Sequence, residues 1–483
     1  MGTGLDFMET GNSLSPPRTM ELSKLQDLDD DGKPKRTGTV WTASAHIITA
    51  VIGSGVLSLA WAMSQLGWVA GPVTLVLFSI VTFYTSSLLA DCYRTSDPIS
   101  GTRNYTYTDA VKSNLGETQL WLCGLCQYVN LFGVSIGYTI TASISAAAVS
   151  KSNCFHYKGH GADCRVSDSI YMIGFGIIQL FLSQLPNFHK LWWLSIVAAV
   201  MSFGYSSIAV GLSFAKTVSG NTGRTSLTGQ EVGVDIDSAQ KIWKTFQALG
   251  DIAFAYSYSM ILIEIQDTIR SPPAENKTMK KASLIGVSTT TIFYMLSGCL
   301  GYAAFGNQSP GNILTGFGFY EPYWLVDLAN LFIIIHLVGA YQVFCQPLFA
   351  AVEKWIMRRN PNMKILSKEL TVIHTKNFRY NMNLFRLIWR SLFVTVATLL
   401  AILMPFFNDI LAFLGAFAFW PLTVYFPIEM YISQKNIERL SPKWTLLKTL
   451  SFLCFLVSLA AACGSIEGVI EALHHYTPFQ TKS

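Results

Sequence analysis

The sequence has little charge for its length. Only 13% of its 483 residues are charged, whereas about 25% is typical of soluble domains, and 51% are hydrophobic. Long stretches without Lys, Arg, Asp or Glu recur along the chain, as in proteins that cross a membrane several times. This shortage of charge excludes a soluble globular protein. The net charge of +5 lies mostly between the apolar stretches, so we expect no nucleic-acid partner.

The sequence also lacks motifs that mark common enzymes and ATP-driven pumps. It has no His-Glu-x-x-His pair and no phosphate-binding loop. Most of its nine cysteines lie inside apolar stretches, where cysteine acts as a small core residue. We therefore expect no enzymatic activity, no cofactor and no metal site.

Eleven apolar stretches are long enough to cross a bilayer, although the fourth is short. They are 40–63, 69–90, 120–149, 169–186, 191–215, 244–265, 282–305, 323–352, 387–407, 409–431 and 446–468. If the N-terminus is cytosolic, 26 of the 34 Lys and Arg residues lie in or close to the inner segments. We therefore predict eleven transmembrane helices with a cytosolic N-terminus and an extracellular C-terminus.

The first apolar stretch, Val40–Met63, carries Gly53, Ser54 and Gly55 at its middle. Glycine adds backbone freedom and no side-chain packing, so we predict that the helix breaks at this triplet. A break frees backbone N–H and C=O groups at mid-membrane depth, and many secondary transporters use them to hold a small charged substrate. The alternative is close helix packing. Small residues four apart serve that purpose, but Gly53 and Gly55 are only two apart.

The chain also divides into two halves of five spans, the second inverted relative to the first because five is odd. This hypothesis requires a second break in the sixth span, which we predict in Ala253–Ser257, among small and hydroxyl-bearing residues. The fold class is then an all-α membrane protein. Its predicted parts are a disordered cytosolic tail (1–36), a first five-helix repeat (37–217), an extracellular loop (218–240), a second repeat with a basic cytosolic loop at 353–386 (241–432), and an eleventh helix with an extracellular C-terminus (433–483).

Several runs of the sequence resemble the plant amino acid permeases of the amino acid/auxin permease family. They are Ser44–Thr49, Gly53–Gly55, Ala60–Trp68, Gly250–Ser257 and Glu264–Thr268. The similarity extends from Lys35 to the end of the chain. It implies a five-plus-five inverted-repeat transporter with eleven spans, which takes up amino acids with protons across the plasma membrane. It also implies that Tyr258, Ser259 and Met260 tune the choice of substrate.

The two predicted breaks suit the two ends of a free amino acid. Breaking the first span starts a new half-helix near Val56, whose free N–H groups suit a carboxylate. Carbonyl groups near the second break would accept from an ammonium group, and side chains would choose among substrates. Packing in the core is the alternative for each aromatic residue taken alone. The predicted substrate-binding residues are Gly53, Ser54, Gly55, Val56, Asn130, Tyr138, Ala253, Phe254, Ala255, Tyr256 and Ser257.

Proton coupling needs a group that titrates, and few such groups lie inside the spans. The candidates are Asp251, His46 and His336, because ionisable side chains at membrane depth are costly and usually functional. Histidine is the natural proton carrier near neutral pH, but a lone histidine can also donate to a helix carbonyl. Asp251 would bind the proton directly or attract a cationic substrate. Glu264 and Asp267, near the inner end of the sixth span, are expected to act as gate residues or to form ion pairs with Arg270 or with the basic inner loops.

Cys154 and Cys164 share one polar loop that the predicted orientation places outside the cell. The extracellular medium is oxidising, so we predict a disulfide between them, with two free thiols as the alternative.

Transport by a symporter that uses a proton gradient is the leading hypothesis, with amino acids, protons and the lipid bilayer as partners. A channel or an amino-acid sensor on the same scaffold is the alternative from another class. A channel would favour a continuous polar pore, whereas the polar residues here gather near two breaks. Coupling to sodium and transport of an auxin-like substrate remain open, because the sequence alone does not decide between these ions or substrates.

Overall fold

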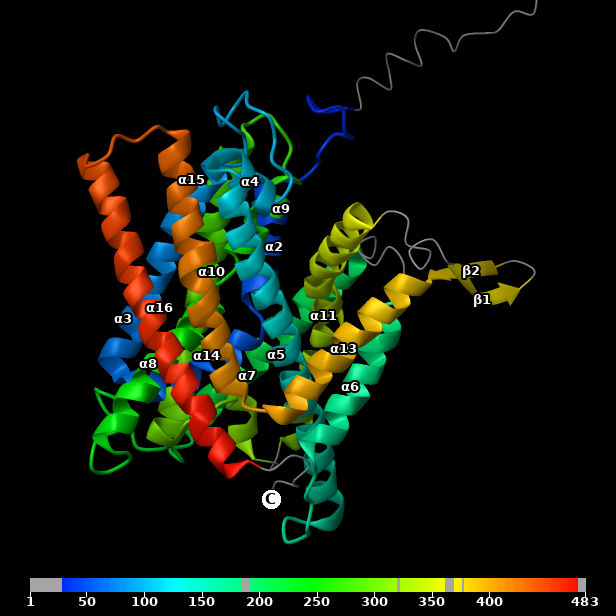
Figure 1. Ribbon diagram of the computed structural model, residues 1–483. Helices are drawn as coiled ribbons and strands as arrows, with labels where there is room; N and C mark the ends of the chain where they lie inside the picture. Colours follow the sequence, from blue (N-terminus) through cyan, green and yellow to red (C-terminus); the bar gives the residue numbers. More distant parts are fainter. Residues whose placement is uncertain (1–27, 185–191, 319–321, 361–368, 376–377, 477–483) are drawn as a thin grey trace, which may run out of the picture.

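The computed structural model describes residues 28–184, 192–318, 322–360, 369–375 and 378–476, and it consists of packed helices (Figure 1). The first half contains α2 (Val40–Val51), α3 (Leu59–Asp91), α4 (Tyr107–Leu115), α5 (Glu117–Lys158), α6 (Asp168–Leu182) and α7 (Trp192–Val218). The second half contains α8 (Ser238–Ala255), α9 (Leu262–Gln266), α10 (Glu275–Phe305), α11 (Tyr323–Arg359), α13 (Leu384–Leu403), α14 (Phe407–Ala418) and α15 (Phe426–Gln434). The long helix α16 (Pro442–His475) follows both halves.

Among the described residues, nine helical segments are long and apolar enough to cross a membrane, and α2 and α6 are shorter apolar helices. The predicted count of eleven spans stays a prediction. The described part of the chain also holds one feature that the sequence did not indicate. Strands β1 (Glu369–Thr375) and β2 (Phe378–Asn383) form an antiparallel hairpin inside the loop predicted at 353–386.

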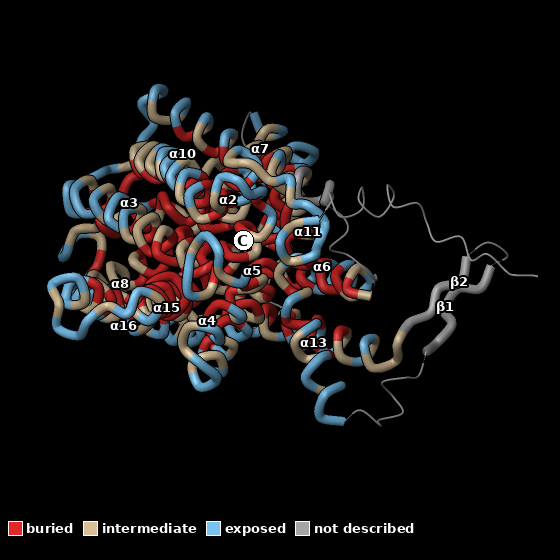
Figure 2. The backbone as a smooth tube through the Cα atoms, turned by 90° about the horizontal axis from the view of Figure 1, so that it is seen from above, coloured by how far each residue is buried: buried red, intermediate tan, exposed pale blue. Residues whose placement is uncertain are grey.

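The bundle buries its centre and exposes apolar side chains on its outer surface. Figure 2 shows the buried residues gathered toward the middle, with exposed residues around the edge. Helix α10 packs along α2 and α3, α11 along α5 and α7, and both α14 and α16 along α8. On α3, exposed apolar residues recur every three or four positions, at Val69, Val73, Leu77 and Ile80. A helix with an apolar exposed stripe fits a hydrocarbon surrounding rather than water.

The first predicted break is present. Helix α2 ends at Val51, Ile52 and Gly53 leave the helical conformation, and a 3-10 turn over Ser54–Leu57 leads into α3. Helix α3 itself bends at Gly67, where φ is +78°, so the first and second predicted spans join without a loop. A side chain at Gly67 would also collide with the backbone of residues 227–229, which lies directly against it.

The second break is also present, but it begins later than predicted. Ala253, Phe254 and Ala255 belong to α8, which ends at Ala255. The chain then runs through Tyr256–Tyr258 and a 3-10 turn at Ser259–Ile261 before α9 starts. Alanine is the strongest helix former, so the alanine-containing half of the predicted segment stays helical.

We call the end of the bundle where residues 28–39 lie the N-terminal face; it is at the top of Figure 1. The prediction of a disordered tail is wrong for residues 28–36. Arg36 forms ion pairs with Asp29 at 2.9 Å, with Asp31 at 2.8 Å and with Asp267 at 2.8 Å. These charges fix the end of the tail against the end of α9. Asp267 is therefore in an ion pair, as expected, and its partner is Arg36 of the tail rather than Arg270.

A second ion cluster on the same face lies behind the first. Glu275 is fully buried and accepts hydrogen bonds from Arg94 at 2.7 Å and from Arg103 at 2.8 Å. Asp30 of the tail reaches both arginines, so the tail closes over this cluster. A buried charge is stable only with partners, and this cluster joins three separate segments, namely the tail, the connection between α3 and α4, and α10.

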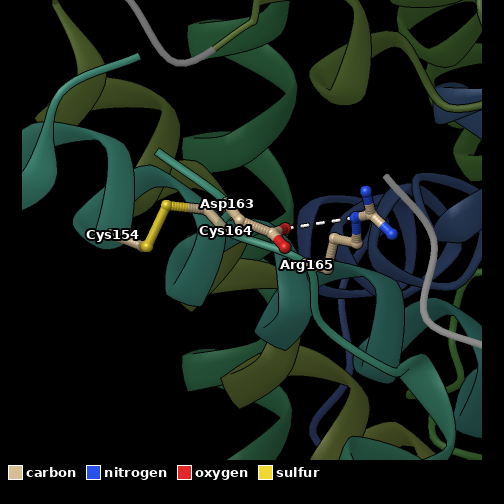
Figure 3. Close-up of a disulfide and its surroundings, with 4 residues drawn as sticks. All are labelled: Cys154, Asp163, Cys164 and Arg165. Carbon is tan, nitrogen blue, oxygen red and sulfur yellow. Dashed lines mark ion pairs between the residues drawn. A yellow bond between two sulfur atoms is a disulfide. The ribbon is translucent and has the colours of Figure 1, made fainter. Parts of the chain in front are cut away.

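Cys154 and Cys164 are joined by a disulfide, as the sequence predicts, and their Cα atoms are 5.8 Å apart. Cys154 lies in the last turns of α5, which runs past its predicted end, and Cys164 lies in the loop before α6. Figure 3 shows the disulfide beside the ion pair of Asp163 and Arg165 on the same loop.

Replacing Arg36 by Gln should free residues 28–36 from the N-terminal face. A charged hydrogen bond contributes about 1.5–3 kcal/mol, so amide hydrogen exchange in this segment should rise at least about tenfold. The matched control is Lys35→Gln, since Lys35 is exposed and forms no ion pair among the described residues. Equal exchange in the two variants would contradict the role given to Arg36.

The attachment should also depend on pH. The hydrogen bond from Arg36 holds the pKa of Asp31 well below its ordinary value. A lowered pKa in the folded state stabilises the attachment above the free carboxyl's pKa of about 4. The stabilisation is lost as the pH falls below that value toward the lowered one. Hydrogen exchange of residues 28–36 should therefore be constant from neutral pH to about pH 5, after correction for intrinsic rates, and should accelerate in more acidic buffer.

Candidate functional site

A small cavity of about 40 Å³ lies where the two breaks meet. A cavity of this size holds a few water molecules at most, so the breaks are closed around it. Its walls come from α2, the first break, α5, the second break and α11. The lining residues are Ala50, Val51, Gly53, Ser54, Gly55, Asn130, Val134, Tyr138, Phe254, Ala255, Ser257, Met260 and Phe344.

Most of the predicted substrate-binding residues meet at this cavity. Those in its lining are Gly53, Ser54, Gly55, Asn130, Tyr138, Phe254, Ala255 and Ser257. Residues that are far apart in the sequence, in the first break, on α5 and around the second break, thus share one small space. Whether they bind a substrate stays a prediction.

Three predicted residues lie outside the lining. The Val56 carbonyl accepts from the Ser297 hydroxyl at 3.3 Å, and Val56 is buried against α10. The Ala253 carbonyl accepts from the Ser257 hydroxyl at 2.7 Å, within the last turn of α8. The Tyr256 hydroxyl lies 3.1 Å from that of Thr291 on α10, which draws the ring away from the cavity.

The lining also includes residues that were not predicted. Val134 lies on α5 four residues after Asn130 and four before Tyr138, so helical spacing alone could have found it. Phe344 contacts Tyr138 edge to face, with ring centroids 5.5 Å apart. It reaches the cavity from α11, and nothing in its local sequence indicates this. Met260, expected only to tune selectivity, lines the cavity and lies 3.8 Å from the Asn130 amide.

The first break presents backbone donors without acceptors. The N–H groups of Ser54 and Gly55 donate to no acceptor among the described residues, and the Ser54 hydroxyl is buried without a partner there. Free N–H groups ahead of a helix form a site for an anion. The first break can therefore hold a carboxylate.

At the second break, the carbonyl groups already accept hydrogen bonds from the protein. The Ala255 carbonyl accepts from Tyr294, and the Phe254 carbonyl accepts from the backbone of Ser257. Each carbonyl oxygen has two lone pairs, so each can accept a second hydrogen bond. An ammonium group would have to use these remaining lone pairs.

Tyr294 of α10 contacts both breaks through its hydroxyl group. Its hydroxyl oxygen lies 2.5 Å from the Val51 carbonyl oxygen and 2.9 Å from the Ala255 carbonyl oxygen. Its ring also packs edge to face against Tyr256, with centroids 5.3 Å apart. One fully buried side chain thus contacts the last residue of α2 and the last residue of α8.

Asp251 lies one turn before the second break, outside the small cavity. Its side chain is fully buried, and neither carboxylate oxygen has a hydrogen-bond partner among the described residues. On the same face of α8, one turn nearer the helix start, Gln247 donates to Asp409 at 2.8 Å. Asp409 belongs to α14, which packs along α8.

Gln247 and Asp409 line a larger cavity of about 660 Å³ between α8, α14 and α16. It lies at the end of the bundle opposite the N-terminal face. The other ionisable residues in its lining are Asp237, Lys244, Glu467, Glu471 and His474. Asp251 therefore sits between a charged outer cavity and the breaks.

The two candidate histidines do not join this group. His336 is buried, and its Nδ1 atom lies 3.1 Å from both the Ser202 hydroxyl and the Ala198 carbonyl of α7. Such contacts fit the structural alternative, in which a histidine bonds to a neighbouring helix. His46 lies on the exposed side of α2, and neither histidine lines the small cavity.

Comparisons with known proteins agree with this architecture. The family model described as transmembrane amino acid transporter protein matches residues 36–471. Amino acid permease 3 of Arabidopsis thaliana is 60% identical over 455 residues, which cover 94% of this chain and 95% of that protein. Amino acid permease 1 of the same plant is 60% identical over 456 residues, or 94% of both chains.

One solved structure shows the same fold. The crystal structure of MhsT in complex with L-phenylalanine aligns with a TM-score of 0.52, covering 90% of this chain and all of the other. The sequences are only 11% identical, so this likeness shows the fold alone. The shared fold agrees with the predicted helical bundle, to which the hairpin of β1 and β2 is an exception.

Replacing Gly55 by Val should cripple uptake of labelled amino acids. A Cβ atom at Gly55 would lie 3.1 Å from the Ala255 Cα and 3.3 Å from the Phe254 ring, and valine adds two methyl groups more. Overpacking costs about 1–3 kcal/mol, which is roughly a five- to hundredfold loss in initial rate. The control is Gly211→Val, the same change on α7, because a Cβ atom at Gly211 would meet nothing within 4 Å. Normal uptake by the Gly55 variant at equal surface expression would contradict the close contact of the two breaks.

Proposed function

The chain belongs to the transmembrane amino acid transporter family, and we propose that it imports amino acids across the plasma membrane together with protons. That it is an amino acid transporter and not an enzyme follows from its relatives. The coupling ion, the direction of transport and the membrane are the proposed part. We also propose that the N-terminal face is cytosolic and the C-terminus extracellular, which the excess of basic residues on that face supports.

The substrate is held at the two breaks, where the backbone recognises the groups common to all amino acids. The N–H groups of Ser54 and Gly55 bind the carboxylate, and the remaining lone pairs near Ala255 accept from the ammonium. The cavity lining contains no Asp, Glu, Lys, Arg or His. A charged substrate side chain would find no opposite charge there, so this lining supports a preference for neutral amino acids.

Transport proceeds by alternating access in this proposal. In the structure, the cavity between the breaks is only about 40 Å³, and the Arg36–Asp267 pair holds the end of α9 on the N-terminal face. To release substrate toward the cytosol, α2 and α9 must move apart and this pair must separate. The closed arrangement supports a carrier over a channel, because the described residues form no continuous polar pore.

The buried, unpartnered carboxylate of Asp251 is the single observation that carries proton coupling. A lone carboxylate in a dry interior is costly, whereas the protonated form is far less so. The proton enters from the outer cavity, past Asp409 and Gln247, and stays on Asp251 while the breaks are closed. Besides Asp409 on α14, the ionisable groups that line this outer cavity are Lys244 on α8, Asp237 just before α8, and Glu467, Glu471 and His474 on α16.

The test of the proposal is uptake into proteoliposomes under separately imposed proton and sodium gradients. An inward proton gradient should drive accumulation of neutral amino acids above equilibrium, and a sodium gradient at equal pH should not. Accumulation driven by the sodium gradient would show that sodium, and not the proton, is the coupling ion. Flux that never exceeds equilibrium under either gradient would favour a channel, and binding without flux would favour a sensor.

Replacing Asp251 by Asn should separate transport from its driving force. The amide cannot carry the proton, so accumulation under a proton gradient should fall to the level of passive equilibration. Exchange of labelled for unlabelled substrate at equal pH should persist. The control is Asp327→Asn, the same chemical change on α11, where Asp327 lies near Asn153 and far from both breaks. Unchanged dependence on the proton gradient in the Asp251 variant would remove Asp251 as the coupling site.

A further inference from the structure

A groove of about 880 Å³ runs along the outer surface between α5, α11 and α13. Its walls are almost entirely apolar, with three tryptophans and a tyrosine among them. Gly124 widens its floor, because a Cβ atom there would meet only the Tyr128 ring, at 3.5 Å. The groove is separate from the small cavity between the breaks and from the outer cavity near Asp409.

The groove lies near three helix ends that point toward the N-terminal face. Trp121 is close to the start of α5, Trp355 is close to the end of α11, and Trp389 is close to the start of α13. All three helix ends lie on that face. Tryptophan gathers where the hydrocarbon meets the lipid head groups, because its ring is apolar and its N–H needs an acceptor. The Trp389 Nε1 atom is buried without an acceptor among the described residues.

Positive charge is concentrated at one end of the groove. Lys354 and Arg358 line it one helical turn apart, both are exposed, and neither forms an ion pair among the described residues. The neighbouring acid, Glu353, is buried and already paired with Arg386 and Arg390. The two cations in the groove are therefore not neutralised by the acid beside them.

We propose that this groove binds one anionic phospholipid from the leaflet on the N-terminal face. An acyl chain lies along the apolar wall, and the phosphate and its anionic head group lie against Lys354 and Arg358. The groove is apolar along its length and has cations only at one end. A phospholipid has the matching parts, an apolar acyl chain and an anionic head group. A helix from a second copy of this chain would fit the apolar wall but would leave both cations unpaired.

The position of the groove links the lipid to transport. Phe132 of α5 lines the groove, and Val134, two residues later, lines the small cavity. On α11, Leu348 lines the groove one turn after Phe344 of the cavity. A bound lipid would thus contact α5 and α11, the two helices that form one wall of the small cavity. We expect the transporter to turn over faster in vesicles that contain phosphatidylglycerol than in pure phosphatidylcholine.

Native mass spectrometry of the full-length protein in detergent tests the binding directly. After titration with phosphatidylglycerol or phosphatidylcholine, the wild type should retain one phosphatidylglycerol far more tightly. Removing both charges with Lys354→Gln and Arg358→Gln should weaken retention of phosphatidylglycerol about 30-fold, the usual effect of two charges near an anionic surface. The matched control is Lys277→Gln with Lys281→Gln, two cations one turn apart on α10 at the same face.

A second variant tests the apolar part while leaving both charges in place. Gly124→Leu fills the floor of the groove and should displace the retained lipid, with an unchanged thermal unfolding midpoint as the check on folding. Equal retention of the two lipids by the wild type would overturn the proposal. So would unchanged retention in the charge variant, or a dimer of the wild type that Gly124→Leu dissociates. None of these readouts requires transport, so they stand apart from the proton-coupling test.

Discussion

Each broken membrane helix leaves backbone polar groups that need partners inside the protein, and the Tyr294 hydroxyl serves both breaks at once. It lies 2.5 Å from the Val51 carbonyl and 2.9 Å from the Ala255 carbonyl. A hydroxyl has a single proton, so the two helix ends share one donor. No water is present at hydrocarbon depth to replace it. The ends of α2 and α8 are therefore held to α10 and to each other, and the lining of the cavity depends on their positions.

The first break was predictable from sequence because its cause is local. Gly53 and Gly55 weaken the helix, and the missing side chain at Gly55 also allows close contact with Ala255. Glycine thus favours both the break and the contact between the two breaks. The second break was placed less well, because its position depends on tertiary contacts. Helix α8 continues to Ala255 while it packs closely against α14, where a side chain at Gly415 would strike the Gly250 carbonyl. The chain leaves the helix only at Tyr256, whose hydroxyl meets Thr291.

Local sequence patterns could not identify the residues that reach the cavity from distant segments. The spacing from Asn130 to Tyr138 points to Val134, but no pattern on α11 singles out Phe344. The tail shows the same limit. Its acidic composition is typical of disorder, yet residues 28–36 are fixed because Arg36, Arg94 and Arg103 converge on one face. Ion pairs between remote segments form only after folding has brought those segments together. The local sequence therefore cannot reveal them.

Two acids, Asp251 and Glu275, are fully buried among the described residues, and movement of the helices would affect them differently. Glu275 is bonded to Arg94 and Arg103, so its charge is neutralised by partners that separate only when the N-terminal face opens. Asp251 has no such partner among the described residues and lies below the outer cavity. Opening the N-terminal face exchanges ion pairs for water, with little change in proton count. In the transport cycle that we propose, opening the opposite face would give the lone Asp251 carboxyl access to water, and a proton could then exchange. Under that proposal, proton movement belongs to one face of the bundle and mechanical closure to the other.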